Sequence, residues 1–225
     1  MQAKETIGYA VGDFGINLYF ISAMTYLLYF YTDVMGLSAT AAAGVMALAR
    51  TVDAVTDPVM GMIAERTRSR FGRLRPWLIL GALPLGVITI LTFTVPDVDA
   101  NGKLWWAYTT YFLFGILYTV VTIPYSVLTA SITSDYAART KLSTWRMACA
   151  FTGGLTVSVG TKPFVDLFAD PADGFQALMA VFAVIATGLL VTTFATTEER
   201  VTAAPEQQLT LKLSMQAVFL NTPLL

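Results

Sequence analysis

The chain of 225 residues contains no histidine and a single cysteine, Cys149. One cysteine excludes an intrachain disulfide, and the absence of histidine excludes the usual zinc sites and the Ser-His-Asp and Cys-His catalytic sets. Charged residues make up only 13% of the chain and hydrophobic residues 56%, whereas soluble domains carry about 25% charged residues. The net charge of −1 gives no sign of a nucleic-acid-binding surface. These scarcities predict an integral membrane protein that is not an enzyme.

Six apolar runs indicate membrane-spanning helices, which need about 20 residues each, although the fifth run by itself is shorter. Helices satisfy their own backbone hydrogen bonds in lipid, and the runs lack the alternation of barrel strands. The expected fold class is therefore an all-α membrane protein, with a six-helix transmembrane bundle over residues 1–197. The short fifth run is expected to begin near Leu142 and to include Arg146. The runs are Phe14–Thr32, Val34–Ala64, Pro76–Pro96, Leu104–Ser134, Met147–Thr161 and Gly174–Thr197.

Basic residues gather in alternate loops. The loop after the first run has none, whereas the segment after the second run carries Arg66, Arg68, Arg70, Arg73 and Arg75. The positive-inside rule then places the basic loops and both termini in the cytoplasm. The N-terminus does not resemble a cleaved signal peptide, so we expect a multi-pass protein of the inner (cytoplasmic) membrane.

Residues 198–225 differ in character from the bundle. The polar stretch EERVTAAPEQQ is followed by LTLKLSMQAVFLNTPLL, which is apolar but short. This pattern predicts a cytoplasmic linker with an amphipathic helix that lies on the membrane surface. The final NTPLL resembles the lead-in to a further span.

The stretch ALARTVDAVTDPVMG, residues 47–61, places three ionisable residues inside the second run. Arg50, Asp53 and Asp57 are spaced by three and four residues, which puts them on one face of a helix. Because charge is costly in lipid, this face is expected to point into the bundle or into a hydrated cavity.

Two close carboxylates near a cation suit a small positive species. Asp53, Asp57 and the hydroxyl of Thr56 offer three oxygens to Na⁺; alternatively, one of the aspartates loads and releases a proton. Pro58 predicts a local break in this helix. A plainer interpretation, in which Arg50 only neutralises one aspartate, leaves the second carboxylate unexplained.

Four stretches together resemble the glycoside-pentoside-hexuronide:cation symporters, the melibiose-permease-like branch of the major facilitator superfamily. The most specific feature is a D-x-x-x-D-P helix followed by an R-x-G-x-x-x-P-W loop. Members have two six-helix halves, so the resemblance implies the N-terminal half of a major facilitator fold, paired with a C-terminal six-helix half or with a second copy of itself. The stretches are YTDVMGLS (31–38), ARTVDAVTDPVMG (49–61), TRSRFGRLRPW (67–77) and YTVVTIPYSVL (118–128).

The resemblance implies uptake of a sugar or glycoside coupled to a cation, with no cofactor. Asp53 and Asp57 match the cation-site aspartates of the family, and Thr119 matches a threonine on the fourth helix. Thr56 replaces an asparagine of the melibiose permease, which leaves both Na⁺ and H⁺ open as the coupling ion.

On the sugar side, Asn17 and Thr122 match positions where the melibiose permease has aspartates. Neither is anionic, so a galactoside loses its charge-assisted hydrogen bonds, and a uronate or another glycoside becomes at least as good a candidate. Tyr118 offers an aromatic face to a sugar. Arg146 matches a cavity-bordering arginine, and either pairs a substrate carboxylate or extends to the membrane interface. Asp13 is expected to be solvated.

The arginine-rich loop is at minimum a topology signal, and the resemblance implies that it also latches the two halves together in one conformation. Glu65 or Asp135 is the expected acidic partner. The loop residues concerned are Arg66, Arg70, Gly72, Arg73 and Arg75.

A different class of function remains open on the sequence. A six-helix chain of this kind can also be a non-transporting membrane subunit, a sensor or a truncated fragment. The loss of both sugar-binding aspartates gives that alternative some weight.

Overall fold

A computed structural model describes residues 3–201, which form six long α-helices and one short π-helix and contain no strand. The all-α prediction is thereby confirmed. The amphipathic helix predicted within residues 198–225 lies outside the described residues from 202 onward, and residues 198–201 are not helical. The elements are α1 (Ala3–Tyr29), η1 (Phe30–Val34), α2 (Ala39–Arg66), α3 (Arg75–Thr92), α4 (Ala100–Ile132), α5 (Tyr136–Val165) and α6 (Pro171–Thr196).

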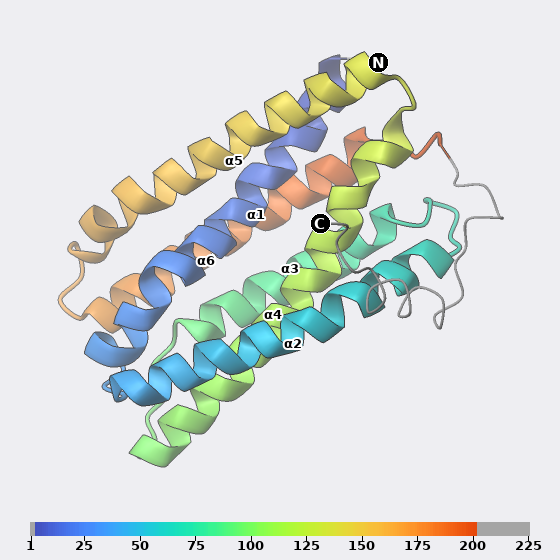
Figure 1. Cartoon of the computed structure of the whole chain (residues 1–225). Helices are drawn as coiled ribbons and strands as arrows, with labels where there is room; N and C mark the ends of the chain where they lie inside the picture. Colours follow the sequence, from blue (N-terminus) through green and yellow to red (C-terminus); the bar gives the residue numbers. More distant parts are fainter. Residues whose placement is uncertain (1–2, 202–225) are drawn as a thin grey trace, which may run out of the picture.

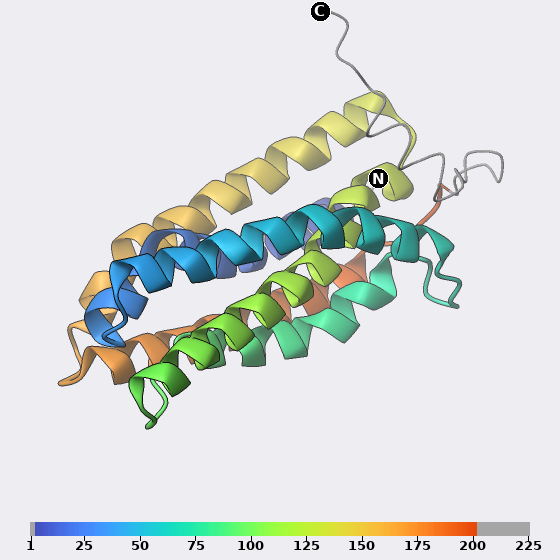
Figure 2. The same cartoon turned by 60° about the horizontal axis from the view of Figure 1, so that its bottom comes forward.

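The helices form one elongated bundle, and both ends of the described chain lie at the same end of it (Figure 1). We call this end the basic end, because it also carries the α2–α3 loop with its arginines. α1 packs against α5 and α6, α3 packs against α4 and α6, and α2 packs mainly against α4. Figure 2 shows α3 and α4 side by side, with α5 on the opposite side of the bundle.

Side-chain caps set where several helices begin. At an N-cap, a hydroxyl or carboxylate oxygen accepts a hydrogen bond from one of the first backbone amides, which have no partner within the helix. Four such caps start helices here: Ser38 for α2, Asp99 for α4, Asp135 for α5 and Asp170 for α6.

Four segments are long and apolar enough to cross a membrane by length and composition: α1 with η1, α3, α4 and α6. α2 and α5 have 28 and 30 residues, which is also sufficient length, but on average their residues are less apolar than those of the other four helices. The helices also extend beyond the apolar runs. α1 begins at Ala3 rather than near Phe14, and α5 begins at Tyr136, ahead of Leu142.

The local irregularity lies elsewhere than predicted. α2 runs through Pro58 as one helix, so the expected break there is wrong. The π-helix η1 instead follows α1, where Phe30 is fully buried against the rings of Phe93 and Phe175 at centroid distances of 5.2 and 5.5 Å. This aromatic cluster joins η1, the C-cap of α3 and α6 at the end opposite the basic end.

Candidate functional site

The charged face of α2 is turned toward α4 and α1. Arg50 Nη1 lies 3.6 Å from Asp53 Oδ2, and Arg50 Nη2 lies 2.7 Å from the sulfur of Met24 on α1. One turn further along α2, Asp57 Oδ1 accepts a hydrogen bond of 2.7 Å from the Thr119 hydroxyl of α4. The structure therefore has the three ionisable groups on one face, as their spacing predicted.

These groups line a cavity of about 200 Å³ between α1, α2 and α4. The two carboxylates, Asp53 and Asp57, share its wall with Thr119 and Thr122. Among the described residues, no three His, Cys, Asp or Glu side chains are placed to hold a metal ion. A pair of carboxylates beside one arginine suits a singly charged guest better than a divalent ion, since divalent sites use more anionic oxygens.

A row of aromatic rings also lines this cavity. The Tyr118 ring stacks on Phe20 of α1 at 5.7 Å between centroids, and on Phe114 of α4 at 5.8 Å. Tyr111 continues the row, with its centroid 5.9 Å from that of Phe114. The cavity thus combines acidic oxygens with flat apolar surfaces, which are the two kinds of group a cation and a sugar ring require.

Three residues predicted for the cation or sugar site, Thr56, Asn17 and Arg146, lie outside the lining of this cavity. The hydroxyl of Thr56 is 3.5 Å from the backbone oxygen of Asp53 on its own helix. The Asn17 amide donates to the Asp13 backbone oxygen at 2.8 Å. Thr122 does line the cavity, although its hydroxyl donates to the Tyr118 carbonyl at 2.9 Å.

Asp13 and Arg146 form an ion pair that the sequence did not predict. Asp13 is only 9% exposed, and Arg146 Nε donates to Asp13 Oδ2 at 2.8 Å. Arg146 Nη1 also donates to the Tyr9 hydroxyl at 3.4 Å. The expectation of a solvated Asp13 is therefore wrong, and Arg146 is paired with a carboxylate of the protein itself. A buried carboxylate needs such a counter-ion because desolvation of an unpaired charge is costly.

The arginine-rich loop is held by Glu199, just after α6. The Glu199 carboxylate accepts hydrogen bonds from the backbone amides of Arg73, Leu74 and Arg75 at 3.1, 2.9 and 3.0 Å. These amides begin α3, where a carboxylate compensates unpaired N–H groups and the helix dipole. Neither acidic partner expected from the sequence bonds to this loop in the described residues, and Asp135 caps α5 instead.

The side chains of the loop reinforce this joint. Arg75 donates through Nε and Nη2 to the Phe194 carbonyl of α6, and its guanidinium lies 4.7 Å from the centre of the Phe194 ring. Arg73 Nη2 donates to the Ser131 hydroxyl of α4 at 3.4 Å. Arg70 lies over the neighbouring Phe71 ring, while Arg66 is exposed at the end of α2.

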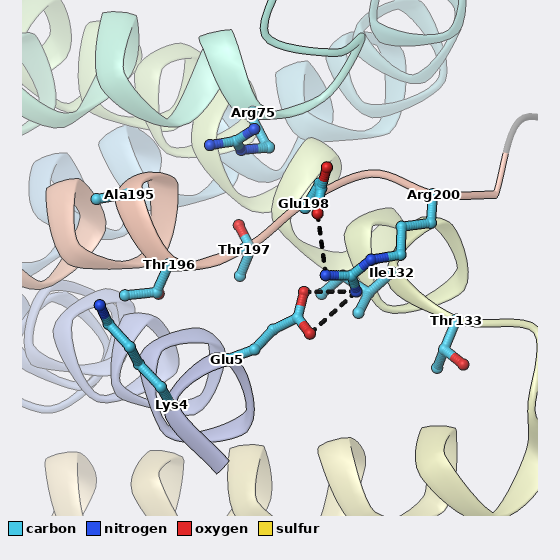
Figure 3. A pocket seen from close by; sticks show the side chains of 10 residues that line it. All are labelled: Lys4, Glu5, Arg75, Ile132, Thr133, Ala195, Thr196, Thr197, Glu198 and Arg200. Carbon is cyan, nitrogen blue, oxygen red and sulfur yellow. Dashed lines mark hydrogen bonds and ion pairs between the residues drawn. The ribbon is translucent and has the colours of Figure 1, made fainter. Parts of the chain in front are cut away.

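A larger hollow of about 750 Å³ lies at the basic end (Figure 3). Glu5, only 4% exposed, accepts hydrogen bonds of 2.9 and 3.0 Å from Arg200 Nη1, and Arg200 Nη2 donates to Glu198 at 3.1 Å. The Arg200 and Val201 amides also donate to the Ser131 carbonyl at 2.8 and 2.9 Å. Since Glu5 and Glu198 are both paired with Arg200, this side of the hollow is a joint between α1, α4 and the segment after α6.

A family model described as MFS/sugar transport protein matches residues 8–225. The inner membrane symporter YicJ of Escherichia coli (strain K12) is 42% identical over 207 residues, which are 91% of this chain and 45% of YicJ. The putative glycoside/cation symporter YagG of the same strain is 40% identical over 204 residues, covering 90% of this chain and 44% of YagG. The isoprimeverose transporter of Lactiplantibacillus pentosus is 36% identical over 225 residues, which cover 98% of this chain and 47% of that transporter. The chain spans about half the length of these curated relatives.

Proposed function

Because the chain belongs to the MFS/sugar transport protein family, we propose that it is the N-terminal half of a symporter that carries a sugar or glycoside together with Na⁺ or H⁺. Its relatives include proteins named as symporters, a putative glycoside/cation symporter and an isoprimeverose transporter. The resemblance to the glycoside-pentoside-hexuronide:cation symporters and the prediction of a multi-pass membrane protein are both confirmed. In this proposal the protein lies in the inner (cytoplasmic) membrane. All six helices span that membrane, and both termini lie in the cytoplasm.

The observation that carries the proposal is the hydrogen bond between Thr119 and Asp57, beside Asp53 in a cavity with an aromatic wall. It gives α2 and α4 a shared polar contact at membrane depth, where unneeded charge is strongly disfavoured. We assign Asp53, Asp57 and Thr119 to the cation or proton. Thr56 joins them as a further ligand if its hydroxyl rotates away from the Asp53 carbonyl.

The sugar is assigned to the same cavity and its margin. Tyr118 and Thr122 line the cavity and supply a ring face and a hydroxyl. Asn17, outside that lining, is assigned a neutral amide contact at its margin. Arg146 acts there through Asp13 rather than as a free cation. Cation and sugar then share α4, so each strengthens the binding of the other, typically by about 1–3 kcal/mol.

Alternating access requires a partner that closes the cavity from the other side. We propose that this partner is a C-terminal six-helix half, or a second copy of this chain, and that it rocks against this half during transport. The arginine-rich loop, with Arg66, Arg70, Gly72, Arg73 and Arg75, then forms the cytoplasmic latch between the halves.

The test is sugar accumulation in proteoliposomes by the transporter assembled from this chain and its C-terminal half. With Asp57→Ala, accumulation driven by a Na⁺ or pH gradient should fall to background, whereas Asp166→Asn should leave it unchanged. Asp166 is a suitable control because its ion pair with Lys162 is exposed and remote from the cavity. Full accumulation by the Asp57→Ala protein would contradict the assigned role. Applying each gradient alone identifies the coupling ion.

A further inference from the structure

Asp13 connects two residues assigned to the margin of the sugar site. Its Oδ2 accepts from Arg146 Nε at 2.8 Å, and its Oδ1 lies 3.5 Å from the Asn17 amide nitrogen. Asn17 is also fixed by the Asp13 backbone oxygen at 2.8 Å. One carboxylate of α1 therefore orients an amide on its own helix and a guanidinium on α5.

The guanidinium of Arg146 is engaged by protein groups on both of its edges. A guanidinium offers two forks to a carboxylate, one that includes Nε and one formed by the two terminal nitrogens. Asp13 takes Nε, and the Tyr9 hydroxyl lies 3.4 Å from Nη1, so each fork has a member already in use. Tyr9 is itself held in place by Thr129 at 2.6 Å and by stacking on Tyr125, with ring centroids 4.8 Å apart.

The charged side chains within the helices also disfavour a substrate that carries a carboxylate. Away from their ends, helices α1, α2, α4 and α5 carry two cationic and three anionic side chains. One singly charged coupling ion makes this set neutral. A carboxylate on the substrate would then add a negative charge that no group counted in this half compensates, which is unfavourable within the membrane. The five side chains are Asp13, Arg50, Asp53, Asp57 and Arg146.

We infer that this half is adapted to an uncharged sugar rather than to a uronate, and that Asp13 sets this preference by occupying Arg146. The inference rests on the proposed function, because it requires a sugar in this cavity. Asp13 is a positioning residue in this scheme: it acts on the substrate through Arg146 and Asn17. It also narrows the choice between a uronate and another glycoside that the sequence left open.

The experiment compares two sugars that differ only at one carbon. Methyl β-D-glucoside and methyl β-D-glucuronide carry a hydroxymethyl group and a carboxylate, respectively, at the same position. The corresponding galactoside and galacturonide form a second pair. The transporter assembled from this chain and its C-terminal half is reconstituted in proteoliposomes, and kcat/KM is measured for each sugar. The ratio within a pair does not depend on the fraction of protein that folds.

The native protein should favour the neutral sugar by about tenfold or more. Asp13→Asn leaves Arg146 without its counter-ion and should shift the ratio toward the uronide by about tenfold. Arg146→Gln should produce no such shift, and Asp13→Asn combined with Arg146→Gln should restore the native preference. Asp166→Asn serves as the control for a lost exposed carboxylate.

Two outcomes overturn the inference while sugar transport itself stands. The first is a native protein that prefers the uronide in both pairs, which needs no variant to fold. The second is an Asp13→Asn protein whose ratio stays within about twofold of native. Absence of uptake or binding for all four sugars would overturn the proposed function and, with it, this inference.

Discussion

The carboxylate of Glu199 occupies the space where a β-carbon on Gly72 would lie. Gly72 has a φ of +100°, a left-handed conformation that favours glycine. The close approach allows Glu199 to reach three amides at the start of α3. Glycine is thus required at position 72 for two reasons: the backbone has a positive φ, and the Glu199 carboxylate leaves no room for a β-carbon.

We predict that Gly72→Ala destabilises the protein more than Gly36→Ala. Gly36 has a φ of +81°, but a β-carbon added there would have nothing within 4 Å, so alanine adds only backbone strain, about 1 kcal/mol. Alanine at 72 also displaces Glu199, for a total of about 2–4 kcal/mol. Thermal unfolding of the purified chain in detergent measures both. Equal losses would contradict the role given to Glu199.

Loss of the hydroxyl should have different effects on stability at two buried tyrosines, Tyr9 and Tyr31. The Tyr9 hydroxyl contacts Thr129 and the Tyr125 carbonyl, whereas the buried Tyr31 hydroxyl has no hydrogen-bond partner in the described part of the chain. Tyr9→Phe should therefore cost about 1–2 kcal/mol of unfolding free energy, and Tyr31→Phe should be neutral or slightly stabilising. Thermal unfolding of the two variants in detergent tests this difference. A greater loss of stability for Tyr31→Phe than for Tyr9→Phe would contradict the prediction.

The features that the sequence predicted are those with a local cause. Long apolar runs indicated the helices, and the spacing of Asp53 and Asp57 indicated a shared face, because helix periodicity acts over a few residues. Asp13 was misread for the same reason. It precedes the apolar run and looks solvated when only its neighbours are considered.

The missed contacts join residues far apart in the chain. Arg146 pairs with Asp13, 133 residues away, and Glu199 binds the amide of Leu74, 125 residues away. Such pairings depend on how helices pack, which spacing within one helix does not reveal. A usable signal for Glu199 was present all the same: the alternation of basic loops predicts that an acidic residue just after the sixth apolar run lies on the same side as the arginine-rich loop.

Glu5 and Glu198, the two acidic partners of Arg200, should contribute different amounts to the free energy of unfolding. The Glu5 side chain is 5% exposed and accepts two hydrogen bonds from Arg200, whereas the Glu198 side chain is 68% exposed. Glu5→Ala should cost about 1–3 kcal/mol, and Glu198→Ala less than about 0.5 kcal/mol. Unfolding midpoints of both variants, compared at one salt concentration, test the order. A larger effect of Glu198→Ala would contradict it.

The pH dependence of this joint follows from the sign of the shift. The hydrogen bond from Arg200 to Glu5 raises the pKa of the Arg200 guanidinium above its ordinary value. A raised pKa means that the stabilisation is complete below the unfolded-state pKa of the guanidinium and is lost only as the pH rises above it. The difference in unfolding midpoint between native protein and Arg200→Ala should therefore stay constant from about pH 7 to pH 10. A decline within that range would show that another group controls the joint.

The two threonines of the cavity should separate cation binding from sugar binding. The Thr119 hydroxyl donates to Asp57 on α2, while the Thr122 hydroxyl donates to a carbonyl of its own helix. A hydrogen bond to a charged group contributes about 1.5–3 kcal/mol, so Thr119→Val should weaken apparent cation affinity by about tenfold or more. Thr119→Ser keeps the hydroxyl and should stay near native.

Thr122→Val provides the matched comparison, since it removes a hydroxyl from the same cavity and the same helix. It should raise the KM for sugar and leave the half-saturating cation concentration unchanged. Both quantities come from initial uptake rates measured over a range of Na⁺ concentrations and pH values. If Thr122→Val weakened cation dependence as much as Thr119→Val, the contact between Thr119 and Asp57 would have no special part in coupling, and the assignment of α2 and α4 to the cation would fail.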